Sequence, residues 1–452
     1  MVADDTLDLN IALSNQAGTP IAYVIASDLQ GVLVDRTLTG DRIRDRLYDL
    51  KMGQHAITIT ATAEGGVQTT AAFSVEVLSI PPPVAILGVT VDGAAATVSW
   101  SGIDHPLFSG YTLRRTIDDG TYFSHVYSGD ATTVLDEIPF GKDITYRVTA
   151  QMRNGDEYDG PVFHYASPVD RLTFNGAIRE TALLAESDRL FVTVWDSDQL
   201  YVVNTSDWSL VETATLPGVP DAMLPSADRR ELYIHLVQED ILRAYRIADL
   251  TPSRRIPLLG RTASTEAAIA TRFALLGDNR IVYGGYGSLA RQITIAGVST
   301  GDTLATLSVD HFDVPAFVGS QDGRRLFVTS ENLVEDYAIS EAGATLRQRT
   351  IRNFVLEGQP FLSPDWHFLT VGREKYDPND LSRQIGLLDG VPIDFADDGK
   401  TGVRSTDVID VATDTKLLTL PGRTVVAAVD AVSREVYFTL SDASQELYRI
   451  FY

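Results

Sequence analysis

The sequence SQDGRRLFV, from Ser320 to Val328, joins a polar turn directly to an apolar strand. Ser, Asp and Gly favour tight turns, because they bond the nearby backbone or tolerate a left-handed conformation. Leu, Phe and Val favour a pleated, half-buried strand. The same turn-plus-strand unit recurs along the last two-thirds of the chain, at residues 187–192, 226–234, 277–283, 320–328, 363–371 and 430–438.

The spacing of these units predicts the architecture of residues 167–452. Equivalent apolar positions fall at 190, 232, 281, 326, 369 and 436, which are 42, 49, 45, 43 and 67 residues apart. A period of roughly 40–50 residues with four strands per repeat is typical of β-propeller blades. We therefore expect six blades, with the strand at 169–175 completing a three-stranded last blade. The long final spacing has two explanations. We favour a loop insertion at about 372–404, and a seventh blade is the alternative.

The turn pattern resembles the YVTN-type repeats of surface-layer and lactonase-like propellers, and the resemblance covers residues 168–452. It implies the propeller fold. It does not assign an activity, because propellers carry many unrelated functions.

The first part of the chain contains two further predicted all-β modules. Three consecutive prolines, Pro81 to Pro83, form a stiff spacer between residues 1–80 and residues 81–166. In the first module Ile57, Ile59 and Ala61 alternate with threonines, as expected for a strand with one buried face. The sequence GQHAIT at 53–58, followed by two glycines and a last strand, resembles bacterial Ig-like domains of the PKD or cadherin-like kind.

Residues 81–166 resemble a fibronectin type III domain. The segments that carry the resemblance are ATVSW at 96–100, GYTLRR at 110–115 and GKDITYRVTA at 141–150. The resemblance implies that Trp100 is a buried strand residue and that Tyr146 has the tyrosine-corner role. Both are therefore expected in the core. The fold class is all-β, with two Ig-like sandwiches followed by a propeller.

Composition excludes several classes of function. The chain has 61 acidic and 37 basic residues and a net charge of −24, which disfavours binding to nucleic acid. It has no cysteine, so disulfides, thiol nucleophiles and cysteine-ligated metals are excluded. No apolar run is long enough for a membrane span. The acidic start lacks a signal-peptide pattern, and the short start of the first module suggests a piece of a longer protein. The order of the modules predicts an extracellular or cell-surface location.

The loops between the second and third strands of each blade are the predicted binding face. They contain aromatic and acidic residues that suit a protein or carbohydrate contact, and the candidates are Trp195, Asp196, Asp198, Tyr286 and Tyr376. Partial burial of these aromatics against neighbouring loops is the alternative.

Two acidic groups are candidates for a metal, with Ca²⁺ as the expected ion because hard cations prefer several oxygen ligands. One is Asp394, Asp397 and Asp398 in a second acidic turn; its spacing is not that of a full calcium loop. The other is Asp310, His311 and Asp313 on a loop between blades. A solvated turn is the alternative for the first group. For the second group the alternatives are a general-base role and a turn capped by His311.

Two functions follow. The first is a non-enzymatic extracellular binding or adhesion protein, with the propeller as interaction module and the Ig-like modules as spacer. The second is a lactonase-like or metal-assisted hydrolase that uses the central pocket. Lactonase-like chemistry requires His, Arg and carboxylate groups that converge on one point. The three histidines of the predicted propeller lie far apart in the sequence and give this function little support; they are His235, His311 and His367.

Overall fold

The computed structural model describes most of the chain and divides it into two compact units. The described residues are 5–13, 19–92, 95–117, 120–195, 197–236, 241–258, 273–277, 280–284, 292–308, 316–330, 333–341, 343–351 and 360–452. One unit comprises residues 1–138 and 143–165, and the other comprises residues 139–142 and 166–452. The described residues form strands, with one short 3₁₀ turn, η1 (Ala185–Ser187), so the all-β prediction is confirmed.

The first unit begins with a two-layer core. One sheet pairs β1 (Leu7–Ala12) with β4 (Arg42–Leu47). The other has the order β3 (Gly31–Leu38), β2 (Ile21–Ser27), β5 (Gly53–Ala63) and β6 (Gln68–Val77). Both sheets contribute to one apolar cluster that includes Leu9, Ile43, Ile25 and Ile57. The predicted alternation holds on β5, where Ile57, Ile59 and Ala61 are buried.

A second, separate core follows in the same unit. One sheet has the order β10 (Tyr122–Ser128), β9 (Phe108–Ile117), β12 (Ile144–Met152) and β13 (Glu157–Asp159), and β14 (Phe163–Tyr165) also pairs with β12. The other sheet has the order β11 (Thr133–Glu137), β8 (Ala95–Trp100) and β7 (Ile86–Asp92). Trp100 and Tyr146 are both buried in the shared cluster, as predicted. The Tyr146 hydroxyl donates to Asp136 at 2.8 Å, which satisfies its polar end.

The second unit consists of seven four-stranded antiparallel sheets among its described residues. The first contains β16 (Ile178–Leu184), β17 (Arg189–Val194), β18 (Gln199–Asn204) and β19 (Ser209–Thr215). The second contains β20 (Pro220–Pro225), β21 (Glu231–Leu236), β22 (Ile241–Arg246) and β23 (Pro252–Pro257). The third contains β24 (Phe273–Leu276), β25 (Arg280–Gly284), β26 (Gln292–Gly297) and β27 (Thr303–Ser308).

The remaining four sheets continue the same order. The fourth contains β28 (Ala316–Gly319), β29 (Arg325–Ser330), β30 (Leu333–Ser340) and β31 (Gly343–Ile351). The fifth contains β32 (Phe361–Leu362), β33 (Leu369–Val371), β34 (Glu374–Asp377) and β35 (Asp380–Leu387). The sixth contains β36 (Pro392–Phe395), β37 (Thr401–Arg404), β38 (Asp407–Asp410) and β39 (Thr415–Thr419). The last contains β15 (Asp170–Thr173), β42 (Ala443–Phe451), β41 (Glu435–Leu440) and β40 (Thr424–Asp430).

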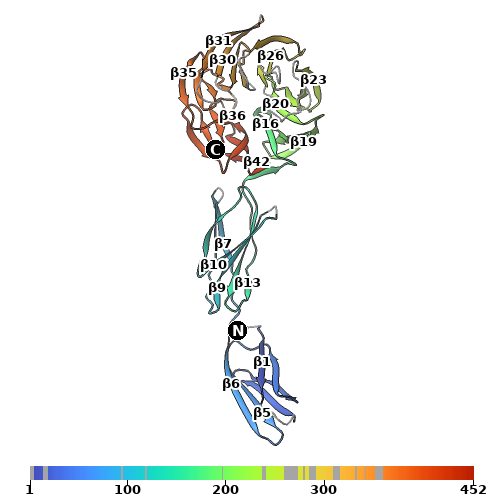
Figure 1. Cartoon of the computed structure of the whole chain (residues 1–452), viewed down its shortest axis with the longest axis vertical. Coiled ribbons are helices and arrows are strands. Elements are labelled where there is room, and N and C mark those ends of the chain that lie inside the picture. The colour runs from blue at the N-terminus through green and yellow to red at the C-terminus, as the bar shows by residue number, and fades with distance from the viewer. Residues whose placement is uncertain are drawn as a thin grey trace. The chain divides into compact units, whose positions relative to one another are not determined.

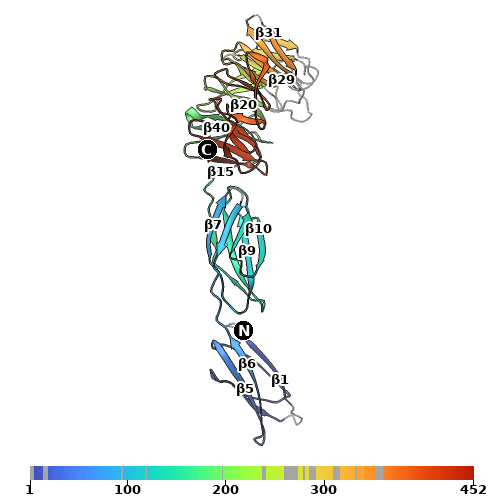
Figure 2. The same cartoon turned by 90° about the vertical axis from the view of Figure 1, so that its left-hand side faces the viewer.

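The sheets of the second unit surround a common centre, as Figure 1 shows. One edge strand of each sheet contacts the equivalent edge strand of a neighbouring sheet. Strand β36 contacts β40, β40 contacts β16, β16 contacts β20, and β28 contacts both β24 and β32. Figure 2 gives the view at right angles, in which β29 and β31 belong to one such sheet. This arrangement is propeller-like. As predicted, the strand before the first sheet completes the last one, because β15 pairs with β42.

A shared hairpin turn explains the repeated sequence. In Ser320 to Arg325, the Ser320 hydroxyl donates to Asp322 at 2.6 Å and accepts the backbone N–H of Arg325 at 2.9 Å. Ser226 makes the equivalent bonds to Asp228 and to the N–H of Glu231. The residue after the aspartate has a left-handed backbone, with φ of 67° at Gly323. Glycine adopts this conformation without steric cost.

The predicted loop insertion at 372–404 is wrong. This stretch contains β34 and β35 of the fifth sheet and β36 and β37 of the sixth. Its turn at residues 396–400 is the same hairpin turn, in which the Gly399 N–H donates to the Ala396 carbonyl and the Lys400 N–H donates to Asp398. This turn was not recognised in the sequence because alanine replaces the serine and because β37 has no aromatic residue.

Arginine and lysine side chains tie successive sheets together. Each reaches a backbone carbonyl in the turn between the third and fourth strands of the next sheet, and the last sheet reaches the first. The pairs are Arg189 to Ile247, Arg325 to Pro378, Lys375 to Val411 at 2.8 Å and Arg449 to Thr205 at 2.5 Å. Within the described residues, no helix has the length and apolarity needed to cross a membrane.

Candidate functional site

A pocket of about 940 Å³ lies where the first two sheets of the second unit meet. It is formed by η1 and the start of β17, by the turn between β20 and β21, by β21 itself, and by the end of β22 with β23. This volume is in the range of small-molecule sites. The lining residues are Ser187, Arg189, Ser226, Asp228, Arg229, Arg230, Glu231, Tyr233, Arg246, Ile247, Ala248 and Arg254.

The hairpin turn before β21 places two adjacent arginines in the pocket. Ser226 and Asp228 fix the turn, and the Ser226 hydroxyl holds the pKa of Asp228 below its usual range. Arg229 has a left-handed backbone, with φ of 57°. Its guanidinium forms an ion pair with Asp397 at 2.7 Å, which lies in the equivalent turn of the sixth sheet. Arg230 lies at the open rim of the pocket, with its side chain 85% exposed and its guanidinium 3.9 Å from Asp228.

Glu231 and Arg254 form the wall of the pocket. Arg254 pairs with Glu231, and the hydroxyls of Tyr233 and Ser253 donate to the same carboxylate at 3.2 and 2.8 Å. Burial acts to raise the pKa of Glu231, but the bonds from Arg254 and Ser253 outweigh it, so this pKa lies below its ordinary value. Desolvation raises the pKa of Tyr233 to about 12, so its hydroxyl stays protonated. The pocket therefore presents a fixed anion and fixed donors at neutral pH.

Arginine dominates the charge of the lining. Five arginines face two carboxylates, Asp228 and Glu231, among the lining residues. Carboxylates next to the lining also pair with these arginines: Asp397 lies 2.7 Å from Arg229, and Asp249 lies 3.3 Å from Arg246. The Nε–H of Arg254 is buried with no hydrogen-bond acceptor among the described residues. Guanidinium groups bind carboxylates through two parallel hydrogen bonds, so this arrangement can hold a ligand that carries carboxylate groups.

The predicted binding face lies at the other ends of the strands. Trp195 follows β17 in the second-to-third-strand loop and is 44% exposed, with the Arg179 guanidinium 3.7 Å from its ring centroid. Asp198 is exposed in the same loop and accepts a bond from the Gln199 amide at 2.7 Å. Asp196 and Tyr286 lie outside the described residues.

The prediction that Tyr376 lies on an exposed loop is wrong. Tyr376 belongs to β34, is 5% exposed, and packs in the cluster between the fourth and fifth sheets. Its hydroxyl donates to Glu374 at 2.6 Å. The preceding residue, Lys375, reaches into the sixth sheet. The charged sequence around Tyr376 suggested a loop, but Lys375 bonds to carbonyl groups of the next sheet and Glu374 accepts the hydroxyl of Tyr376 itself.

The structure does not bring Asp394, Asp397 and Asp398 together as a metal site. Asp394 lies in β36, Asp397 pairs with Arg229, and Asp398 accepts the Lys400 N–H at 2.8 Å. Across the part of the chain that is described, no group of three or more His, Asp or Glu side chains could hold a metal ion. The other candidates, Asp310, His311 and Asp313, lie outside the described residues.

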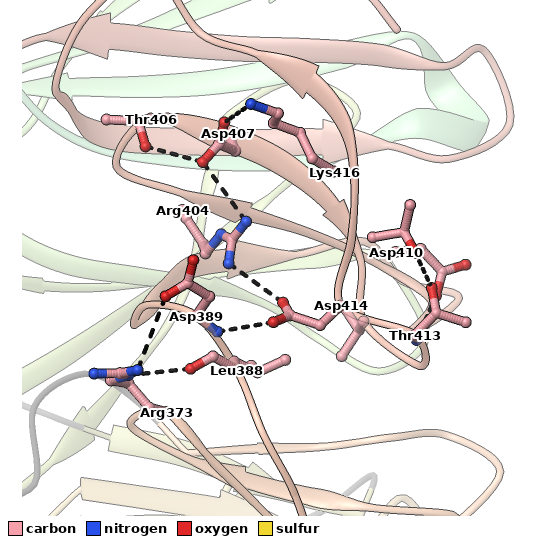
Figure 3. Close-up of polar contacts among 12 residues, drawn as sticks. Arg373, Leu388, Asp389, Arg404, Thr406, Asp407, Asp410, Thr413, Asp414 and Lys416 are labelled. Atoms are coloured by element: carbon pink, nitrogen blue, oxygen red, sulfur yellow. Dashed lines mark hydrogen bonds and ion pairs between the residues drawn. The ribbon is translucent and has the colours of Figure 1, made fainter.

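A second polar cluster joins the fifth and sixth sheets (Figure 3). Arg404 is buried and lies 3.3 Å from Asp414 and 3.6 Å from Asp407. Asp414 also accepts the backbone N–H of Asp389 at 2.9 Å, and the Asp389 carboxylate lies 4.0 Å from Arg373. These charges compensate one another across the boundary between sheets. We therefore assign this cluster to the packing of the sheets.

Sequence reasoning missed the arginine pocket, although a signal was present. Most copies of the repeated turn contain arginine, as in DR at 188–189, DRR at 228–230 and DGRR at 322–325. We expected the binding groups in the loops at the opposite ends of the strands. Arginine within the turn itself would have pointed to this end of the sheets.

Comparisons with known proteins give only a distant likeness. No family model matches the sequence. No curated protein matches it. A chain in a solved structure titled "Crystal Structure of Mitotic Checkpoint Complex" is 13% identical, with a TM-score of 0.49, and the match covers 62% of this chain and 91% of that chain. We base no argument on a likeness this distant.

Proposed function

We propose that the chain is an extracellular binding protein whose second unit holds a ligand bearing carboxylate groups in the arginine pocket. The observation that carries this proposal is the concentration of five arginines around one pocket on a chain of net charge −24. Carboxylates of the chain already pair with four of these arginines, so the carboxylates of the ligand bind to the remaining N–H donors of the guanidinium groups. The ligand belongs to a protein or a carbohydrate at a cell surface.

In this proposal the seven sheets are the seven blades of a propeller, of the YVTN kind suggested by the turn sequences. The two sandwiches of the first unit, of Ig-like and fibronectin type III-like character, act as the spacer. Support comes from the separate cores of the two sandwiches and from their three-proline spacer.

Variants at Arg230 test the proposal. Arg230→Gln removes an exposed pocket cation, and Arg383→Gln is the matched control, since Arg383 is 69% exposed in the same unit and does not line the pocket. A hydrogen bond to a charged group contributes about 1.5–3 kcal/mol, so R230Q should weaken binding about tenfold or more. R383Q should bind like the wild type.

The probes are a polyglutamate peptide, an acidic uronate oligosaccharide and a neutral oligosaccharide, with binding measured by calorimetry. We expect one acidic probe to bind, more weakly as salt increases, and the neutral probe not to bind. The proposal fails if no acidic probe binds, or if R230Q and R383Q reduce binding equally. The acidic probe that binds identifies the source of the carboxylates.

A second candidate function, hydrolysis at the centre of the second unit, is favoured by Asp394. This carboxyl is half-buried on β36, one of the innermost strands, and desolvation raises its pKa to about 7. Such a group can exchange a proton near neutral pH, as a general acid or base does. A screen of lactones and esters tests this candidate: turnover that is lost in Asp394→Asn supports it, and no turnover in the wild type rejects it.

A further inference from the structure

The strand β10, at the edge of the second sandwich in the first unit, lacks the usual protection of an exposed edge. It ends the order β10-β9-β12-β13, so no described strand pairs with its outer side, and it lies beside β9 in Figures 1 and 2. It pairs with β9 over seven residues without a bulge. It contains no Asp, Glu, Lys or Arg, whereas every other described edge strand of seven or more residues contains at least one.

The backbone of β10 has a defined outward side. The Ile117 N–H donates to the Thr121 carbonyl, and the Gly129 N–H donates to the Ser109 carbonyl. In an antiparallel ladder, hydrogen-bonded pairs alternate with non-bonded pairs. The odd-numbered residues of β10 therefore bond to β9, and the even-numbered residues direct their N–H and C=O groups outward. The outward residues are Tyr122, Ser124, Val126 and Ser128.

The side chains of β10 are also unusually apolar for an exposed strand. Phe123, His125 and Tyr127 form a row of rings on one face, with centroids 6.3 and 4.6 Å apart. Tyr122 and Val126 are exposed on the other face. Proteins usually block such an edge with charges, prolines or bulges, because it is a template for another strand. An unblocked edge of this kind is therefore open to pairing with another strand.

We propose that β10 pairs with the β10 of a second copy of this chain, antiparallel and with the twofold axis at His125. In this register Ser124 lies opposite Val126 of the second copy, and Tyr122 lies opposite Ser128. Both are hydrogen-bonded positions, so all four outward residues of each strand gain partners. Phe123 meets Tyr127 of the second copy, and cross-strand aromatic pairs stabilise sheets.

The register explains why the occupant is a second copy: β10 is complementary to itself about His125, because Phe123 meets Tyr127 and every outward residue meets another outward residue. Two copies with a net charge of −24 each repel one another over most of their surface. The strand itself places no like charges opposite each other, and Arg115 lies 4.7 Å from the Phe123 ring, beside the contact. The dimer should therefore tighten as salt screens the remaining repulsion. Binding of an acidic ligand to the arginine pocket should weaken with salt, so the two proposals fail independently.

Sedimentation velocity of the full chain over a wide range of concentration, at low and high salt, tests the dimer. Val126→Lys adds a charge at a 66% exposed edge position, and Leu87→Lys adds the same charge on β7, an edge of the opposite sheet, at a position 71% exposed. V126K should weaken the dimer at least tenfold, while L87K and the uncharged variant Val126→Thr should dimerise like the wild type. Equal thermal unfolding of the variants shows that each is folded.

Single-cysteine variants test the register, because the chain contains no cysteine of its own. Residues at a non-bonded antiparallel pair have Cα atoms about 4.5 Å apart, within the range for a disulfide. His125→Cys should therefore form a disulfide-linked dimer on mild oxidation, and Ser124→Cys, which faces Val126 of the second copy, should do so much less. A chain that stays monomeric at all concentrations, a V126K variant that dimerises normally, or equal crosslinking at both positions overturns the proposal. Pairing of β10 with a different protein by a monomeric chain also overturns it.

Discussion

Replacing Asp394 by asparagine should remove a pH-dependent component from the stability of the second unit. Desolvation is the main reason that the pKa of Asp394 rises from 3.8 to about 7, and the nearby Asp397 acts in the same direction. The backbone N–H groups of Phe395 and Val429 oppose the rise without cancelling it. In the unfolded chain the carboxyl returns to its ordinary pKa.

The direction of this pH dependence follows from proton binding. Because the folded pKa is the higher one, the folded state holds the proton more tightly between pH 4 and pH 7. The stabilisation is fully present below the unfolded pKa and is lost as pH rises through the folded pKa. One pH unit between the two values corresponds to about 1.36 kcal/mol. From pH 5 to pH 8 the wild type should therefore lose about 2.5–3 kcal/mol through Asp394 alone.

Urea unfolding followed by tryptophan fluorescence measures this effect. Trp195, Trp208 and Trp366 lie in the second unit, so three of the four tryptophans report on it. Asparagine does not titrate, so the difference in unfolding free energy between D394N and the wild type should change by about 2.5–3 kcal/mol across this pH range. A difference in unfolding free energy that is the same at every pH does not affect this test. If the two pH profiles run parallel, the reasoning is refuted.

Two further substitutions test the buried ion pairs of each unit. Asp336→Asn should destabilise the second unit by about 3–5 kcal/mol in urea unfolding, because it removes the buried charge that partners Arg325. Arg325 bonds to both Asp336 oxygens, at 3.0 and 2.7 Å. A loss below about 1 kcal/mol would contradict this reasoning. Asp136→Asn should lower the stability of the first unit by about 1–3 kcal/mol, because it weakens the bonds from Tyr146 and Arg115. Calorimetry should show that only the transition of the first unit moves.

The elements of the fold could be predicted where the sequence repeats a local physical device. The turn from Ser320 to Arg325 satisfies its own backbone through one serine and one aspartate, so it can be recognised without knowing its neighbours. Burial of Trp100 and Tyr146 was implied by the resemblance to a fibronectin type III domain and is confirmed. The sixth sheet was missed because the same turn forms at Ala396 to Lys400 without the serine.

The location of the candidate site could not be predicted in the same way. Lys375 and Tyr376 have the composition of a loop, yet they lie in a buried strand because the lysine reaches carbonyl groups of the next sheet. Asp397 resembled a calcium ligand in sequence and pairs with an arginine in the structure. In both cases the partner that determines the role lies on another sheet.

The sequence by itself determined the secondary structure class and the hairpin turns, because alternation and turn chemistry act over a few neighbouring residues. The strand that completes the last sheet was predicted from the repeat, which left the last unit one strand short. Only the tertiary structure decided which distant partners the arginines of these turns meet. Arg229 and Asp397 are 168 residues apart along the chain and meet at 2.7 Å. Such contacts depend on how sheets pack and tilt around the centre, and no local pattern of side chains specifies that geometry.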